Sequence, residues 1–144
     1  MKSSILKTMD KDHVMIKEVL IDFEKEENKN FEKSKHVFSR FKWMLEKHFF
    51  IEEKAIFNFY IIESPEENDN LMRILKEHRE ILGLIEEAEE LLFDQKKLEI
   101  EELKHYILAH AKFEDEVFYP NLDEILTEEQ KQEMISRIKD IIIE

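Results

Sequence analysis

The 144-residue chain has no cysteine, one glycine and two prolines. Without cysteine there is no disulfide, no thiolate metal ligand and no cysteine nucleophile. Few glycines and prolines leave little to interrupt long helices, and the dominant residues, Lys, Glu, Leu and Ile, favour helices further. We therefore expect an all-α protein.

Long apolar runs and basic runs are also lacking. No stretch approaches the roughly 18 apolar residues of a membrane span, and the N-terminal MKSSILKTMDKDH has no apolar signal-peptide core. The formal net charge is −13, and the lysines and arginines form no long basic run. This argues against a nucleic acid or an anionic membrane as partner, because phosphate contacts need a concentrated basic face. We expect a cytoplasmic protein with a single domain over residues 1–144.

Apolar residues recur at helical spacing in four stretches, which predict four long helices. The first lies around residues 9–23, the second over about 31–62, the third from Pro65 to a break near Asp94, and the fourth around 103–117. Pro120 marks the end of the fourth helix or a kink in it. Short connections between long helices favour antiparallel neighbours. We therefore expect an up-down-up-down four-helix bundle over about residues 9–122.

Two capping boxes divide the chain further. Ser64 and Glu67 form one, with Pro65 in the first helical position, and TEEQ at residues 127–130 forms the other. The second box predicts a short C-terminal helix over about residues 127–143. The sequence leaves open whether this helix covers the bundle or mediates a homodimer.

The two halves of the chain resemble each other around four histidines. KDHVMIKEVL, which contains His13, resembles KEHREILGLI, which contains His78; HFFIEEKAIFNFY from His48 resembles HAKFEDEVFYPNL from His110. In the second pair a glutamate follows the histidine by four residues, so both side chains lie on one helix face. Pseudo-twofold packing of the two halves would bring six residues together: His13, His48, Glu52, His78, His110 and Glu114.

This combination of buried imidazoles and carboxylates indicates a metal site. A buried, unpaired carboxylate is costly, and a bound cation removes that cost. Nitrogen and oxygen ligands without sulfur suit iron, manganese or zinc. A pair of irons with these ligands would keep vacant positions at which dioxygen, peroxide or nitric oxide can bind.

The pattern resembles the hemerythrin-like family, specifically its duplicated His-His-Glu (HHE) cation-binding motif, over the chain up to about residue 122. The resemblance implies a non-haem di-iron centre inside a four-helix bundle. Each iron would have two histidines and two carboxylates would bridge them, with His13 and His48 on one iron, His78 and His110 on the other, and Glu52 and Glu114 as bridges. Asp115 is an alternative to Glu114, because oxygen-carrying hemerythrins have an aspartate five residues after this histidine.

The sequence departs from oxygen-carrying hemerythrins at Ile74. Those proteins have a further histidine there, one turn before the histidine that corresponds to His78. The second iron would therefore have one imidazole fewer, and water, a carboxylate or a phenolate such as that of Tyr106 would take its place. This makes exchangeable, reactive chemistry a better expectation than reversible oxygen carriage.

The family includes oxygen carriers, sensors of oxygen or iron, and proteins that repair iron–sulfur centres damaged by nitric oxide or oxidants. The resemblance thus implies a di-iron protein that binds or reacts with O2, NO or peroxide in sensing, storage or repair. Two alternatives stay open: a di-iron oxidase, peroxidase or NO reductase, and a metal-stabilised regulatory module that acts through a protein partner.

Other conspicuous residues have ordinary interpretations. His36 and His105 lie off the apolar stripes, so we expect both to be solvated. The aromatic residues near the histidines are expected to pack in the core: Trp43, Phe49, Phe50, Phe57 and Phe59.

Overall fold

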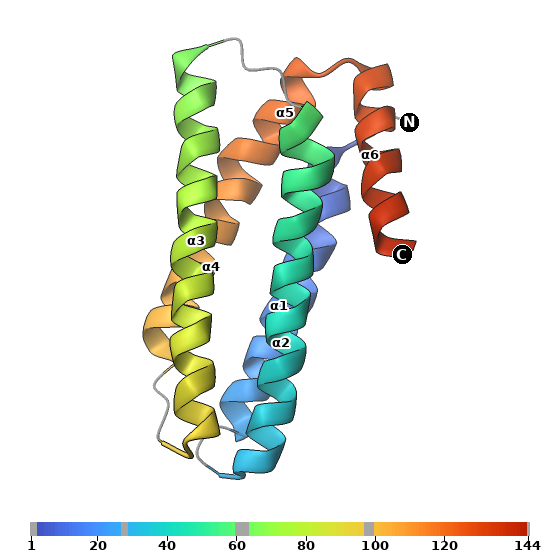
Figure 1. Cartoon of the computed structure of the whole chain (residues 1–144). Coiled ribbons are helices and arrows are strands. Elements are labelled where there is room, and N and C mark those ends of the chain that lie inside the picture. Colours follow the sequence, from blue (N-terminus) through green and yellow to red (C-terminus); the bar gives the residue numbers. More distant parts are fainter. Residues whose placement is uncertain (1–2, 27–28, 60–63, 97–99, 144) are drawn as a thin grey trace.

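The structure, a computed structural model, describes residues 3–26, 29–59, 64–96 and 100–143. Four long helical segments run antiparallel and form a bundle, and a further helix lies beside it (Figure 1). The helices are α1 (Ile5–Glu26), α2 (Phe31–Ile51), α3 (Pro65–Phe93), α4 (Glu101–Phe113), α5 (Tyr119–Ile125) and α6 (Glu128–Ile143). The expected all-α four-helix bundle is confirmed.

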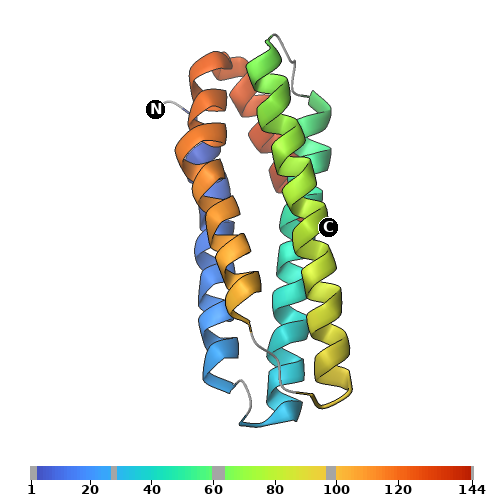
Figure 2. The same ribbon diagram turned by 90° about the vertical axis from the view of Figure 1, so that its left-hand side faces the viewer.

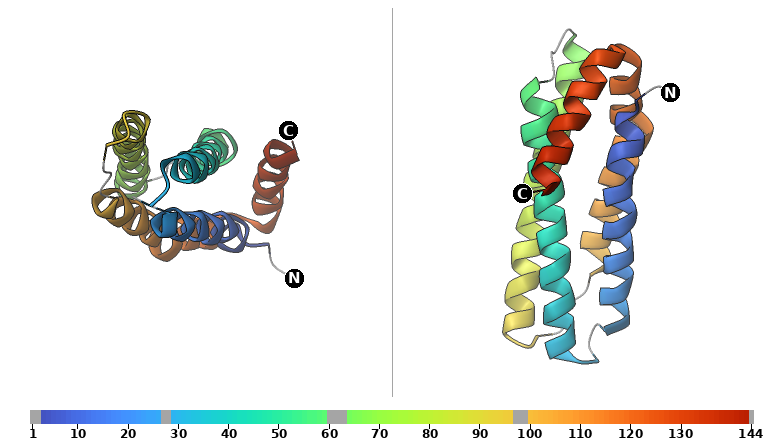
Figure 3. Two further views of the ribbon diagram at one scale, coloured as in Figure 1. Left: turned by 90° about the horizontal axis from the view of Figure 1, so that it is seen from below. Right: turned by 90° about the vertical axis from the view of Figure 1, so that its right-hand side faces the viewer.

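The helices form a closed ring in which each long segment has two neighbours. α1 packs against α2 and α5, and α3 packs against α2 and α4. The second side view shows α4 next to α1, and α3 next to α2 (Figure 2). α6 contacts α1 and α2 and stands outside the ring, as the view along the bundle shows (Figure 3). Its Met134 and Ile138 are buried in the bundle core, so the C-terminal helix covers one side of the bundle.

The core consists of two apolar clusters. One fills the half of the bundle around Phe23, Phe38 and Ile85. The other fills the half around Met9 and Phe118, next to α6. Along each long segment the predicted histidine lies between residues of the two clusters, so the polar residues form a layer between them.

The second and fourth segments each contain a short π-helix. η1 spans Glu52–Ile56 and η3 spans Glu114–Phe118. The N–H of Phe57 donates to the carbonyl of Glu52, and the N–H of Tyr119 donates to that of Glu114, five residues back in each case. η3 is followed directly by α5, which has Pro120 in its first turn. The segment therefore continues to Ile125 instead of ending at the proline.

The π-helices explain two wrong predictions of burial. An α-helical stripe through Glu52 and Glu114 would bury Phe59 and Val117, yet these side chains are 46% and 42% exposed. A π-turn contains an extra residue and rotates the side chains that follow it. As a result Phe118, rather than Val117, is buried.

Two further aromatic residues were predicted incorrectly. Trp43 and Phe50 are 61% and 50% exposed, although Phe49 is buried as expected. Trp43 lies on the outer face of α2, where the ammonium of Lys47 stands 4.9 Å from its ring centre. After η1, a 3-10 turn spans Phe57–Phe59. The predicted end of the second helix at Ile62 lies outside the described residues.

Side-chain caps begin α3 and α6 where the sequence predicts. The Ser64 hydroxyl accepts a hydrogen bond from the N–H of Glu67. Thr127 and Gln130 cap each other reciprocally: the Thr127 hydroxyl accepts from the Gln130 N–H at 3.1 Å, and the Gln130 side-chain oxygen accepts from the Thr127 N–H at 2.9 Å. Within the described ranges, none of the helices combines the length and the apolarity that a membrane crossing requires.

The first turn of α1 is capped by a residue distant in sequence. Asp123 of α5 accepts hydrogen bonds from the N–H groups of Ile5, at 2.6 Å, and Leu6, at 3.2 Å. The hydroxyl of Ser4 also donates to this carboxylate, at 3.0 Å. One side chain therefore ties the start of α1 to the end of the fourth segment.

We expect Asp123→Ala to lower the free energy of unfolding by about 1–2 kcal/mol, because it leaves two helix N–H groups without their partner. Urea denaturation followed by circular dichroism measures the change. Asp22→Ala, at an exposed position of α1, is the matched control and is expected to change stability by less than about 0.5 kcal/mol. Equal effects of the two substitutions would contradict the role assigned to Asp123.

Candidate metal centre

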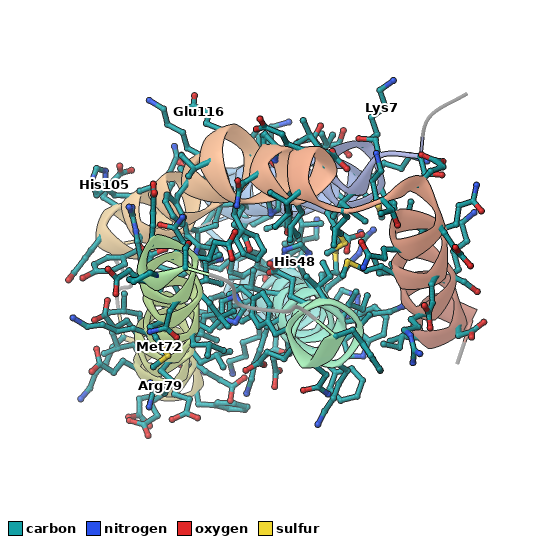
Figure 4. All side chains as sticks on the ribbon, turned by 90° about the horizontal axis from the view of Figure 1, so that it is seen from above. Lys7, His48, Met72, Arg79, His105 and Glu116 are labelled. Carbon is teal, nitrogen blue, oxygen red and sulfur yellow. The ribbon has the colours of Figure 1, made fainter. Side chains whose placement is uncertain are left out.

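The six residues that the sequence singled out lie together in the middle of the bundle. Each is at most 4% exposed: His13, His48, Glu52, His78, His110 and Glu114. Seen from above, His48 points into the interior between the helices, whereas Lys7, Arg79, His105 and Glu116 lie at the periphery (Figure 4). The four segments of the bundle thus each supply at least one side chain to one buried layer.

Four of the six residues form a first group of converging donor atoms, Glu52, His78, His110 and Glu114, which lie within 4.8 Å of one another. Four buried atoms of this group have no hydrogen-bond partner among the described residues: Oε1 of Glu52, Nε2 of His78, Nε2 of His110 and Oε2 of Glu114. Polar atoms buried without a partner are rare in proteins and need an explanation. Two carboxylates and two imidazoles converging in this way are a suitable ligand set for a divalent cation.

The second group consists of His13, His48 and Glu114. Nε2 of His13 lies 3.1 Å from Nε2 of His48 and 3.1 Å from Oε1 of Glu114. The Glu114 carboxylate thus belongs to both groups, and its Oε1 also lies 3.2 Å from Nε2 of His110. Glu52, in contrast, belongs only to the first group.

Three of the four imidazoles form a hydrogen bond through Nδ1 with a carboxylate outside the six-residue layer, here called an outer carboxylate. The Nδ1 atoms of His13, His48 and His110 form hydrogen bonds with Asp115 at 2.9 Å, Asp12 at 3.1 Å and Glu77 at 2.8 Å, respectively. Metal-binding histidines in general use their second ring nitrogen in this way, which orients the ring and leaves Nε2 for the metal.

Asp115, which the sequence offers as an alternative to Glu114, contacts Nδ1 of His13. The other ring nitrogen of His13, Nε2, contacts His48 and Glu114. A third possible ligand group joins Asp115 with Asp10 and His13 at the edge of the layer.

His78 is the exception among the imidazoles. Neither of its ring nitrogens has a hydrogen-bond partner among the described residues. Its ring stacks on that of Phe49, with centres 3.8 Å apart and planes 17° from parallel. Stacking thus orients this imidazole in place of a carboxylate.

The outer carboxylates Asp12 and Glu77 were not predicted as site residues, although the internal repeat contains a signal for both. Asp12 immediately precedes His13 in KDH, and Glu77 immediately precedes His78 in KEH. Asp12 contacts His48 and Glu77 contacts His110, so each acid contacts the other layer histidine of its half of the repeat rather than its own neighbour. The repetition of an acid before the histidine could have revealed this pairing.

The tyrosine that contacts the layer is Tyr119, whereas the sequence had suggested Tyr106. Tyr106 is 37% exposed, and its pKa is raised by the neighbouring carboxylate of Glu80. Tyr119 is fully buried, and its hydroxyl donates a hydrogen bond to Oε2 of Glu52 at 3.0 Å. Ile74 occupies the position at which the sequence lacks the additional histidine of oxygen-carrying hemerythrins, and its apolar side chain is fully buried.

The electrostatics of the layer are dominated by close pairs of opposite charge. Burial opposes a charge on His110, but the carboxylates of Glu114 and Glu77 outweigh it and raise the pKa of this imidazole to about 10. Burial likewise opposes the charge on Glu114, yet the surrounding imidazoles hold the pKa of this carboxyl well below its usual range. Burial and the nearby carboxylates raise the pKa of Tyr119 well above its usual value, so its hydroxyl keeps its proton.

A comparison with protein families supports the interpretation of this layer. The family described as Hemerythrin HHE cation binding domain matches residues 4–122, a range that contains all six residues of the layer. No curated protein matches the chain, and no solved structure matches it. Because the family match covers well over half of the sequence, the chain belongs to the hemerythrin family, with an HHE cation binding domain.

Proposed function

We propose that the buried layer binds two iron ions and that this non-haem di-iron centre binds or reacts with a small molecule, O2, NO or peroxide. The observation that carries the proposal is the group of Glu52, His78, His110 and Glu114, whose donor atoms lie within 4.8 Å of one another. Each of the four also has a buried atom without a hydrogen-bond partner among the described residues. A cation bound by this group would provide a partner for such buried atoms.

The choice of a transition metal follows from the donors. Imidazole nitrogens suit iron, zinc, copper and nickel, whereas magnesium and calcium prefer oxygen ligands alone. Four imidazoles and two carboxylates can bind iron, manganese or zinc. We favour iron because a reaction with O2, NO or peroxide requires a redox-active metal. Glu114 would be shared by the two ions, because it belongs to both groups of donors.

A small ligand is supported by the space around the layer. A cavity of about 10 Å³ lies beside His13, His48 and His110, and its other walls are mainly apolar side chains such as Ile107 and Leu45. A space of this size takes about one water-sized molecule. The donor groups contain four residues and three residues, so two metals would keep positions for such a ligand.

The first test counts metal. Anaerobic reconstitution with Fe2+, followed by elemental analysis and absorption spectra before and after O2, NO or peroxide, is expected to give two irons per chain and a spectral change. His48→Ala and His110→Ala are expected to lower the iron content, because each removes a donor. His36→Ala and His105→Ala remove exposed histidines and serve as matched controls.

Three other results of this reconstitution experiment would point to a different conclusion. Iron content that is unaffected by the two buried substitutions would contradict the proposal. Turnover of the added ligand would indicate the oxidase, peroxidase or NO reductase alternative. Exclusive binding of zinc, with no spectral response, would indicate the metal-stabilised regulatory module.

We expect metal binding to release protons near neutral pH. The pKa of His110 lies at about 10 instead of 6.5, so this imidazole is protonated at neutral pH. A metal binds the neutral ring, and the proton must therefore leave. The affinity for the metal should therefore rise with pH up to about 10, the pKa of His110. Calorimetry with Zn2+ in buffers of different ionisation enthalpy measures the release, and identical enthalpies in all buffers would count against it.

The outer carboxylates provide a further test. We expect Asp12→Asn and Glu77→Gln each to weaken metal binding by about 10–100-fold, because they remove the hydrogen bonds that orient His48 and His110. Competition with a chromophoric chelator measures the affinity. Glu53→Gln changes an exposed carboxylate next to the layer and should leave the affinity unchanged; a loss as large in this control would mean that general charge, not orientation, is responsible.

A further inference from the structure

The two groups of donors in the layer are not equivalent. In the first group, Glu52, His78, His110 and Glu114 each have a buried atom without a hydrogen-bond partner among the described residues. In the second, Nε2 of His13 is already in contact with Nε2 of His48 and with Oε1 of Glu114, at 3.1 Å in both cases. The first group also contains close pairs, with Nε2 of His110 at 3.2 Å from Oε1 of Glu114 and Nε2 of His78 at 3.4 Å from Oε1 of Glu52. It differs from the second group in having four donor residues instead of three. A cation in the second group must in addition separate the two imidazole nitrogens of His13 and His48.

The carboxylates of Glu52 and Glu114 also differ in their contacts. Oε1 of Glu52 lies 3.0 Å from Nε2 of His48 and 3.4 Å from Nε2 of His78. Its other oxygen, Oε2, accepts the hydrogen bond from the Tyr119 hydroxyl at 3.0 Å. A carboxylate that bridges two cations uses one oxygen for each of them. The hydroxyl of Tyr119 therefore competes with a cation for the second oxygen of Glu52.

Tyr119 lies next to His13, a member of the second group. Its ring stacks on that of His13, with centres 5.8 Å apart and planes 29° from parallel. The corresponding residue of the internal repeat is Phe57, whose ring stacks on that of His78, with centres 6.0 Å apart and planes 23° from parallel. The two aromatic rings are thus placed alike, but only one carries a hydroxyl. Among the described residues, Oε2 of Glu114 has no hydrogen-bond partner.

We propose that the layer loads its two cations in order and that Tyr119 is the positioning residue that sets this order. The group of Glu52, His78, His110 and Glu114 fills first. The group of His13, His48 and Glu114 fills second and more weakly, because the Tyr119 hydroxyl holds the oxygen of Glu52 that would otherwise complete it. This inference rests on the proposed function, namely that the layer binds two cations.

The test titrates the full chain with Mn2+, which is a spin probe, and follows binding by calorimetry and electron paramagnetic resonance. For the natural sequence we expect two steps of unequal affinity. At one equivalent the spectrum should be that of an isolated Mn2+, and the second equivalent should convert it to that of a spin-coupled pair.

Tyr119→Phe removes only the hydroxyl and frees the second oxygen of Glu52. We expect the second step to tighten by about tenfold, the equivalent of one hydrogen bond to a charged group, with little change in the first. The coupled-pair signal should then already be prominent at one equivalent. Tyr106→Phe, which removes an exposed hydroxyl, is the matched control and should behave like the natural sequence.

Two further variants test the order without changing Tyr119. His13→Ala is expected to remove the weaker step, and His78→Ala the tighter one. Circular dichroism establishes that each variant is folded.

The outcomes separate the inference from the proposed function. Two equal steps in the natural sequence, an unchanged second step in folded Tyr119→Phe, or loss of the tighter step in His13→Ala would overturn the ordered loading and leave a two-cation centre in place. Failure of Mn2+, Fe2+ and Zn2+ alike to bind would overturn both.

Discussion

A layer of four imidazoles and two carboxylates, each at most 4% exposed, lies between the two apolar clusters of the bundle. Burial opposes charge on every one of these groups, and a buried charge is tolerated only when it is paired and hydrogen-bonded. The surrounding structure meets this constraint in large part. Outer carboxylates contact three imidazoles, and Glu114 lies among the Nε2 atoms of three histidines. Among the described residues, buried atoms of Glu52, His78, His110 and Glu114 still lack hydrogen-bond partners, and these four residues form a group that could hold a cation.

The outer carboxylates also link the helices. Asp12 of α1 contacts His48 of α2, and Glu77 of α3 contacts His110 of α4. Each half of the internal repeat is therefore fastened by the same carboxylate–imidazole hydrogen bond. The side chains that orient these imidazoles thus also hold neighbouring helices together, so the orientation of the imidazoles and the packing of the helices depend on each other.

The π-helices give the layer its approximate symmetry, and one oxygen atom breaks it. η1 and η3 begin at Glu52 and Glu114, which are equivalent in the repeat. The residue five positions after each glutamate faces the layer, and it is Phe57 in one half and Tyr119 in the other. π-helical turns are frequent at functional sites, where they change the direction of side chains. Here such a turn places the hydroxyl of Tyr119 against Glu52, whereas the equivalent residue of the other half, Phe57, carries no hydroxyl.

The sequence alone determined the helices, their caps and the six residues of the layer. Apolar periodicity, the Ser64 and Thr127 caps and the spacing of four between His48 and Glu52 all depend on neighbours within one or two helical turns, and such neighbours can be identified from sequence. The partners on other helices could not: the contact of Asp12 with His48, the choice of Tyr119 over Tyr106, and the exposure of Trp43 depend on how the helices pack. The π-turns add an extra residue after each glutamate, which ordinary helical spacing cannot reveal. Only the tertiary structure therefore decided which side chains after Glu52 and Glu114 are buried and how the two halves of the layer differ.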